Sequence, residues 1–192
     1  MALGRRDLAR AFSIGGHPML LLPASVLLAR LDSGRDRDTA WILGLILGAM
    51  AVLAIYVVRA VRRQEVTDID VSQREQRPRM FAVAIASVSL VCVALWLSGQ
   101  PPAVLRGAVA ALVLLIVCTA SNQLGLKASL HTAFAVYAAA VLYSANPAWG
   151  AAGYALAIGV GWSRVELQRH TTREVVAGLV LGTAISLGML LL

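Results

Sequence analysis

The sequence predicts an all-α protein, a polytopic transmembrane helical bundle with six to seven spans. Of its 192 residues, 59% are hydrophobic and only 14% are charged, and a soluble domain of this length cannot bury so much apolar surface. The charged residues also gather in short clusters between long apolar runs. Because a helix needs about 20 apolar residues to cross a bilayer, with about 17 as a lower limit, these runs indicate membrane-spanning helices.

Seven apolar runs are candidate spans. They cover Ile14–Ala29, Ala40–Val58, Met80–Ser98, Ala103–Asn122, Ala128–Ala145, Ala148–Trp162 and Val175–Leu192. Basic residues precede the first run as in a signal peptide, but no small-x-small cleavage site follows it, so a retained first helix is expected. This helix, about residues 14–29, is expected at the periphery of a single domain spanning residues 1–192, with the motif-bearing core at about 59–192. The spacings Gly44-x-x-x-Gly48 and Gly178-x-x-x-Gly182 suit close helix packing.

The excess of Arg has two explanations, an anionic ligand and high-GC codon usage, which also yields Arg. The net charge is +7, and sixteen of the seventeen basic residues are Arg, whose planar fork of donors suits phosphate. Nucleic-acid binding is disfavoured because no soluble basic domain exists to carry it. Cys92 and Cys118 both lie inside apolar runs, which argues against a disulfide framework or a metal cluster. No cofactor is expected.

Three polar segments interrupt the apolar background. They are Asp70–Arg79 before the third predicted span, Lys127–His131 at the start of the fifth, and Ser163–Glu174 between the sixth and seventh. Two spans separate the first segment from the second, and two more separate the second from the third. Since a span cannot stop midway, all three segments are expected at the same face of the membrane.

The residue types in these segments suit phosphoryl transfer. His170 has Glu174 one helical turn later, so the carboxylate can hold the Nδ1 proton and leave Nε2 free to attack phosphorus. His131 is the candidate general acid for the leaving alkoxide. Arg77, Arg164, the hydroxyl of Ser129 and nearby backbone amides are candidate ligands of the phosphate oxygens. These groups require no metal.

The three segments resemble the signature motifs of the type 2 phosphatidic acid phosphatase superfamily, which also includes the vanadium haloperoxidases. That family's pattern is Lys-x6-Arg-Pro, then Pro-Ser-Gly-His, then Ser-Arg-x5-His-x3-Asp. Here the third motif is nearly complete, with Ser163-Arg164, His170 and Glu174 at the family's spacing. Ser129 and His131 match in the second motif, and Arg77-Pro78 match in the first. The resemblance implies a lipid phosphate phosphatase that works through a phosphohistidine.

The sequence departs from the pattern at several positions. Glu174 replaces the motif Asp and is expected to keep its orienting role, while Ala128 and Leu130 replace Pro and Gly. Asp70 stands where the family places Lys. Either Arg74 or Lys127 is expected to supply the missing positive charge, and Asp70 is expected to pair with Arg74 at i+4.

One His and one acidic pair stand outside the motifs. His17 matches no motif, which favours a structural or interfacial role. Asp68-x-Asp70 is reminiscent of a metal–pyrophosphate site, but such sites use a second acidic cluster, which this sequence lacks.

Charge asymmetry predicts the orientation. If all seven spans cross, the motif-bearing face carries 13 of the 17 basic residues, which places the catalytic face in the cytoplasm of a bacterial inner membrane. The resemblance implies a substrate such as a phosphatidic acid-like or polyprenyl-linked phosphate or pyrophosphate. The alternatives are a non-catalytic or transport-like bundle that retains the motifs, and a metal-dependent membrane transferase. The oligomeric state stays open.

Overall fold

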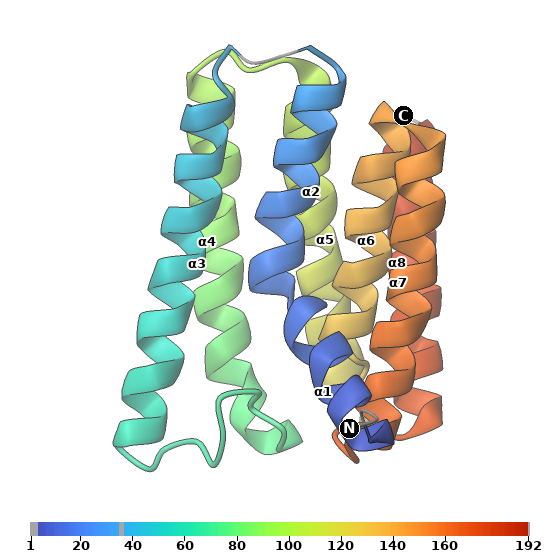
Figure 1. Cartoon of the computed structure of the whole chain (residues 1–192). Coiled ribbons are helices and arrows are strands. Elements are labelled where there is room, and N and C mark those ends of the chain that lie inside the picture. The colour runs from blue at the N-terminus through green and yellow to red at the C-terminus, as the bar shows by residue number, and fades with distance from the viewer. Residues whose placement is uncertain (1–3, 35–36, 192) are drawn as a thin grey trace.

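All regular elements are helical in the computed structural model, which describes residues 4–34 and 37–191 (Figure 1). The elements are α1 (Arg5–Gly15), α2 (Pro18–Asp32), α3 (Thr39–Arg62), the 3-10 turn η1 (Arg74–Gln76), α4 (Arg77–Leu97), α5 (Pro102–Gln123), α6 (Leu130–Ala145), α7 (Pro147–Glu166) and α8 (Thr172–Leu191). From α3 onward the helices coincide with the predicted runs to within a few residues. Proline in the first turn of α2, α4, α5 and α7 explains several of these starts, because the missing N–H is not needed there.

The first predicted span is two helices rather than one. α1 and α2 meet at a bend of 58°, at Gly16 and His17. A side chain at Gly16 would lie 2.1 Å from Val160 of α7, so only glycine allows this close approach. His17 then caps α2, since its Nδ1 accepts a hydrogen bond of 3.2 Å from the backbone N–H of Met19.

Within the described residues, four helices are long and apolar enough to cross a membrane, namely α3, α5, α8 and the segment Arg74–Leu97 that contains α4, and the bent α1–α2 pair would make a fifth. The expected six to seven spans are therefore not confirmed: α6 has only 16 residues, and α7 is not among the four. Large apolar side chains on the outer surface, such as Leu90, Trp96 and Ile158, are exposed, as expected for helices that face lipid.

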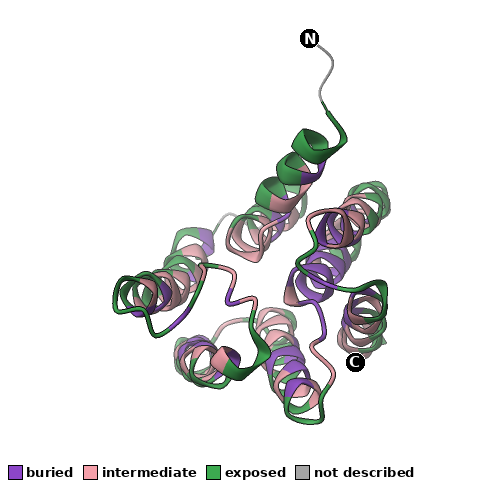
Figure 2. Cartoon of the chain, turned by 90° about the horizontal axis from the view of Figure 1, so that it is seen from below, coloured by how far each residue is buried: buried purple, intermediate pink, exposed green. Residues whose placement is uncertain are grey.

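The chain forms a bundle in which the N-terminal end of α1 and the loops around residues 63–76, 124–129 and 167–171 share one end (Figure 1). Seen from that end, buried residues line the inner faces of the helices (Figure 2). α6 packs against α2, α7 and α8, and its residues His131–Ala140 are all buried. The last turn of this helix reaches the surface, where Tyr143 is exposed, but the other helices shield most of its length from lipid.

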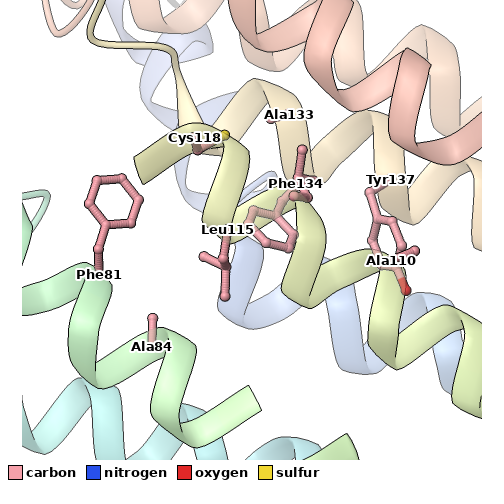
Figure 3. Close-up of a cluster of buried hydrophobic side chains, with 9 residues drawn as sticks. Phe81, Ala84, Ala110, Leu115, Cys118, Ala133, Phe134 and Tyr137 are labelled. Atoms are coloured by element: carbon pink, nitrogen blue, oxygen red, sulfur yellow. The ribbon is translucent and has the colours of Figure 1, made fainter. Parts of the chain in front are cut away.

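Aromatic and small side chains of α4, α5 and α6 form the main core cluster, which includes Phe81, Leu115, Cys118 and Phe134 (Figure 3). The second glycine spacing joins α8 to this core. A side chain at Gly178 would lie 2.6 Å from the carbonyl oxygen of Ser129, and one at Gly182 would lie 2.7 Å from that of Ala133. Gly44 and Gly48, by contrast, have no atom within 4 Å of the position of a side chain, so the first spacing mediates no contact within the described chain.

Candidate active site

The three polar segments converge at one end of the bundle, as their order along the chain predicts. The backbone N–H of Ser129 donates to the carbonyl of Glu174 at 3.0 Å, joining the second segment to the third. Arg77 Nη1 donates to the carbonyl of Ala128 at 3.4 Å, which joins the first to the second. The Arg164 guanidinium binds the Asp70 carboxylate at 2.8 Å and joins the third to the first.

His170 lies in a short connection whose backbone is fixed on both sides. Gln168, two residues after the end of α7, lies in the left-handed region, at φ 57°. The carbonyl of Arg164 then accepts hydrogen bonds from the N–H groups of Arg169 at 3.0 Å and of His170 at 3.1 Å. The first of these is the bond of a Schellman C-cap. It holds the His170 backbone against the end of α7.

Glu174 orients the His170 ring and also caps α8. Its Oε2 accepts the N–H of Thr171 at 3.0 Å, and its own N–H donates to Thr171 Oγ1 at 3.3 Å, which forms a reciprocal capping box. The same Oε2 lies 3.0 Å from Nδ1 of His170. A carboxylate accepts only, so it selects the tautomer with the proton on Nδ1 and leaves the Nε2 lone pair free. The spacing His170-x-x-x-Glu174 therefore leaves one ring nitrogen with a free lone pair and places the group that orients the ring beside the other nitrogen.

Burial keeps this imidazole neutral. It lowers the pKa of His170 to about 4, helped by the positive charges of Arg77, Lys127 and Arg164 and opposed by Glu174. A neutral ring at physiological pH is the form that can attack phosphorus.

Of the two candidates for the missing motif Lys, the structure brings only Lys127 close to His170. Lys127 Nζ lies 3.7 Å from Glu174 Oε2 and donates to the carbonyls of Ser72 at 3.2 Å and Arg169 at 3.3 Å. Arg74 lies in the 3-10 turn before α4, has a side chain that is 44% exposed, and pairs with Glu75 at 3.5 Å. The turn breaks the continuous helix on which Arg74 and Arg77 would have shared a face.

Two arginines are buried at the site. Arg77 is held by the carbonyl of Val71 at 3.0 Å as well as by that of Ala128. Arg164 is 2% exposed; its Nη1 donates to Ser13 Oγ at 2.7 Å, and its Nε has no partner. An unpartnered buried guanidinium N–H is a donor available to a bound anion.

The predicted pairing of Asp70 with Arg74 is wrong. Asp70 instead binds Arg164 at 2.8 Å and lies 3.9 Å from Arg169. Asp70 precedes Val71, which adopts a left-handed φ of 46°, so these residues form a turn and not the helix that an i+4 pair requires. Burial alone would raise the pKa of Asp70, but the charge and hydrogen bond of Arg164 outweigh it and lower that pKa. The carboxylate is therefore ionised inside the site.

The second segment contributes the start of α6. Ser129 is fully buried and caps the helix, accepting from the N–H of Thr132 at 3.4 Å and from its hydroxyl at 3.0 Å. The N–H groups of Leu130 and His131, in the first turn, have no carbonyl partner within the helix. His131 is 8% exposed, and its Nε2 is buried without a hydrogen-bond partner. The His131 ring and the first-turn amides of α6 are thus both available to a ligand.

A long, mostly apolar cavity of about 420 Å³ runs along the bundle. Its walls come mainly from α2, α3, α4, α5 and α6. His17, Asp70, Arg77 and His131 line it at the motif-bearing end, Arg30, Ser33 and Ser144 line it at the other end, and apolar side chains such as Leu22, Leu53, Phe81 and Phe134 line most of the rest. A cavity of this kind suits an amphiphile whose polar head lies at the motif-bearing end.

A family model for the PAP2 superfamily matches residues 80–192. The chain belongs to the PAP2 superfamily. The match covers more than half of the chain and includes His131, Arg164, His170 and Glu174 of the second and third motifs, whereas the first motif, with Arg77, lies before it. It confirms the resemblance to the superfamily. PAP2 proteins are generally phosphatases, and the long apolar helices make this one a membrane member of the superfamily. Neither the curated proteins nor the solved structures include one that matches this chain significantly.

His17 is the site residue that sequence reasoning missed. It lies outside the part of the chain that matches the PAP2 family, and its ring contacts that of His131 with a centroid distance of 4.7 Å and an interplanar angle of 85°. No spacing signals this contact, because the bend between α1 and α2 creates it. The one available signal was that His17-Pro18 interrupts an apolar run.

One ring nitrogen each of His17 and His131 and one carboxylate oxygen of Asp70 lie within 4.8 Å of one another, a set of donors that can hold a divalent cation. Two features oppose this. The carboxylate already binds Arg164 at 2.8 Å. Nδ1 of His17 accepts an N–H, so in the neutral ring Nε2 carries the proton and cannot ligate a metal. Two of the three groups are therefore already engaged in ways that oppose binding of a cation.

Proposed function

We propose that the protein is a membrane lipid phosphate phosphatase, which hydrolyses a phosphomonoester or pyrophosphate of a lipid through a phosphohistidine at His170 and without a metal. The observation that carries the proposal is the 3.0 Å contact between His170 Nδ1 and Glu174, at a ring on which the positive charges of Arg77, Lys127 and Arg164 act. Membership of the PAP2 superfamily supports it independently.

The proposed reaction has two steps. The lone pair of His170 Nε2 forms a bond to phosphorus while the bond from phosphorus to the lipid oxygen breaks, and His131 gives its proton to that oxygen. A water molecule then attacks the phosphohistidine. His131, now neutral, takes one proton of that water, and the electron pair of the N–P bond returns to Nε2. The sum is one lipid alcohol and one phosphate for each ester and water consumed.

The buried cations suit the charge that develops on the phosphoryl group. Arg77, Arg164 and Lys127 all act electrostatically on His170, so a phosphate at Nε2 would lie within their field. In the proposed complex they neutralise the equatorial oxygens, aided by the first N–H groups of α6 and the Ser129 hydroxyl. Arg74 is assigned no contact with the phosphate.

The cavity suits a lipid substrate, either phosphatidic acid-like or polyprenyl-linked. Its apolar walls would hold a hydrocarbon chain, and burial of each methylene contributes about 0.8 kcal/mol. The phosphate would then reach the cavity's polar residues, Arg77 and His131.

We further propose that α6 and α7 also cross the bilayer, as interior helices, and that the motif-bearing end lies in the cytoplasm of a bacterial inner membrane. α6 is shielded from lipid by α2, α7 and α8, and α7 has the 20 residues that a span needs. The motif-bearing end carries most of the basic residues, as the positive-inside rule requires. Cysteines introduced at Arg63 and Ser33, at opposite ends, test this orientation, since an impermeant reagent applied from outside should label only the second.

Phosphate release from short-chain lipid phosphates in detergent tests the function. The wild-type protein should release phosphate in EDTA and be inhibited by vanadate, which mimics the trigonal-bipyramidal transition state. His170→Ala should abolish release, whereas Arg106→Ala, an exposed arginine at the other end of the bundle, should leave it unchanged. Wild-type activity that needs a divalent metal, or full activity in His170→Ala, would refute the proposal.

A further inference from the structure

We infer, on the basis of the proposed function, that His17 and Asp70 are positioning residues for the step in which the leaving group departs. They orient the His131 ring and stabilise its protonated form, so that His131 can protonate the departing lipid oxygen. Neither role follows from the motifs, because His17 precedes all of them and Asp70 stands where the family pattern has a phosphate-binding Lys. The inference therefore assigns Asp70 a role in proton transfer in place of phosphate binding.

These residues lie on the side of the site that faces the cavity. His17, Asp70 and His131 all line the apolar cavity, whereas His170, Arg164 and Lys127 do not. If the lipid chain occupies the cavity, the oxygen that links it to phosphorus lies on the cavity side of the phosphate. In-line attack then places His170 on one side of phosphorus and the His17–Asp70–His131 group on the other.

The groups around His131 set the charge that it meets. The positive guanidinium of Arg164 in α7 acts on this imidazole, as do the rings of His17, from the bend between α1 and α2, and His170, from the connection before α8. Asp70 is the carboxylate that acts on it, and it lies with His17 and His131 in the set of atoms within 4.8 Å. A general acid must carry a proton before it can donate one, so a buried His131 beside the Arg164 guanidinium needs this negative charge.

The His17 ring is held in one position by its own hydrogen bond and by the packing of its neighbour. Its Nδ1 is engaged by the N–H of Met19, and the bend that presents it is locked because Gly16 packs directly on Val160. In the neutral ring the remaining nitrogen, Nε2, carries a proton and is a donor. The His17 ring lies against that of His131 at 4.7 Å, so it limits the orientations His131 can adopt and lines the space where the leaving oxygen would lie.

The proton balance is simple. The proton of the His131 imidazolium passes to the lipid oxygen as the P–O bond breaks, and the attacking water replaces it in the second step. Asp70 keeps its negative charge throughout, and His17 keeps its proton. Loss of either residue should therefore impair mainly those reactions that need the leaving oxygen to be protonated.

Two substrates with the same hydrocarbon tail separate this role from a structural one. An alkyl phosphate has a poor leaving group and needs the acid, whereas a nitrophenyl phosphate that carries the same tail leaves as a stable anion. Asp70→Asn and His17→Asn should lower kcat/KM for the alkyl phosphate by about 10- to 100-fold more than for the nitrophenyl phosphate, below the about 10²- to 10⁴-fold that a general acid supplies. Asp70→Glu should restore part of the loss. Asp68→Asn, a matched control two residues away, should leave the ratio of the two rates unchanged.

An equal loss on both substrates in both variants would overturn the inference and leave the proposed function intact, as would a gain of activity in Asp70→Asn, because the carboxylate would then be competing with phosphate. If Asp70→Asn fails to fold, judged by its melting temperature in detergent, the ratio measured for His17→Asn decides alone. A wild-type protein that hydrolyses neither substrate would overturn the proposed function and this inference with it.

Discussion

Replacing Glu174 by Gln separates the two tasks of this side chain. Glutamine at this position can still complete the capping box with Thr171, so α8 should start at the same residue. The amide carries no charge, however, and a ring bonded to phosphorus through Nε2 becomes positive. Glu174→Gln thus removes the counter-ion of the covalent intermediate while leaving the fold in place.

The contact distance sets the size of the effect. Two unit charges 3.0 Å apart attract by about 5 kcal/mol at an effective dielectric constant of about 20, which is a ceiling of about 10⁴ in rate. Lys127, 3.7 Å from the same carboxylate oxygen, offsets part of this attraction. We therefore expect kcat to fall by about 10²- to 10⁴-fold, with a change in unfolding free energy below about 1 kcal/mol.

Thr171→Ala is the matched control. It removes the hydroxyl that accepts the N–H of Glu174 at 3.3 Å but keeps the carboxylate, so it should cost about 1 kcal/mol of stability and change kcat little. Phosphate release and thermal unfolding in detergent measure both quantities. The reasoning would be refuted if Glu174→Gln kept more than a tenth of the wild-type kcat, or if Thr171→Ala lost as much activity as Glu174→Gln.

Three further predictions concern charge, packing and pH. Lys127→Ala should raise KM about tenfold, since a charged hydrogen bond contributes about 1.5–3 kcal/mol. Arg74→Ala should behave like wild type. Equal KM values in the two variants would contradict the assignment of Lys127, and not Arg74, to the phosphate. Gly182→Ala should destabilise the protein by about 1–3 kcal/mol because its new carbon would meet the backbone of α6. Gly48→Ala should be neutral or stabilising by up to about 1 kcal/mol. Melting temperatures that fall equally in the two variants would contradict the close packing of α8 on α6. The pKa of His170 is about 4 in the folded protein and 6.5 for a fully solvated histidine, so between these pH values the unfolded chain binds more protons and stability should fall as the pH falls from 6.5 to 4. The melting temperature of His170→Asn should fall less over the same range. A fall as large as that of the wild type would contradict the burial of this ring.

The sequence sufficed for the helices that face lipid and for the third motif. Hydropathy reports lipid contact directly, so helices such as α3 and α5 begin and end close to the predicted residues. His170 and Glu174 are close in the chain, and one helical turn brings them into contact whatever the rest of the fold does. Convergence of the three segments at one end followed from the number of helices between them.

Local irregularities of the backbone produce the contacts of the site that the sequence could not predict. The 3-10 turn at Arg74 and the left-handed Val71 rotate Asp70 away from Arg74. The bend after Gly16 brings His17 against His131, a contact between residues more than a hundred positions apart. Both depend on tertiary packing, such as the fit of Gly16 on α7, for which no periodic pattern exists.

Trapping the covalent intermediate tests the central claim most directly. In His131→Ala, a nitrophenyl phosphate should still transfer its phosphoryl group to His170, but the attacking water would lack a base, so the phosphohistidine should accumulate. Rapid quenching at alkaline pH followed by mass spectrometry should then find one phosphoryl group on the peptide that carries His170, and none in the His131→Ala, His170→Ala double variant. Nitrophenol release without label at His170, or label that persists in the double variant, would contradict the account.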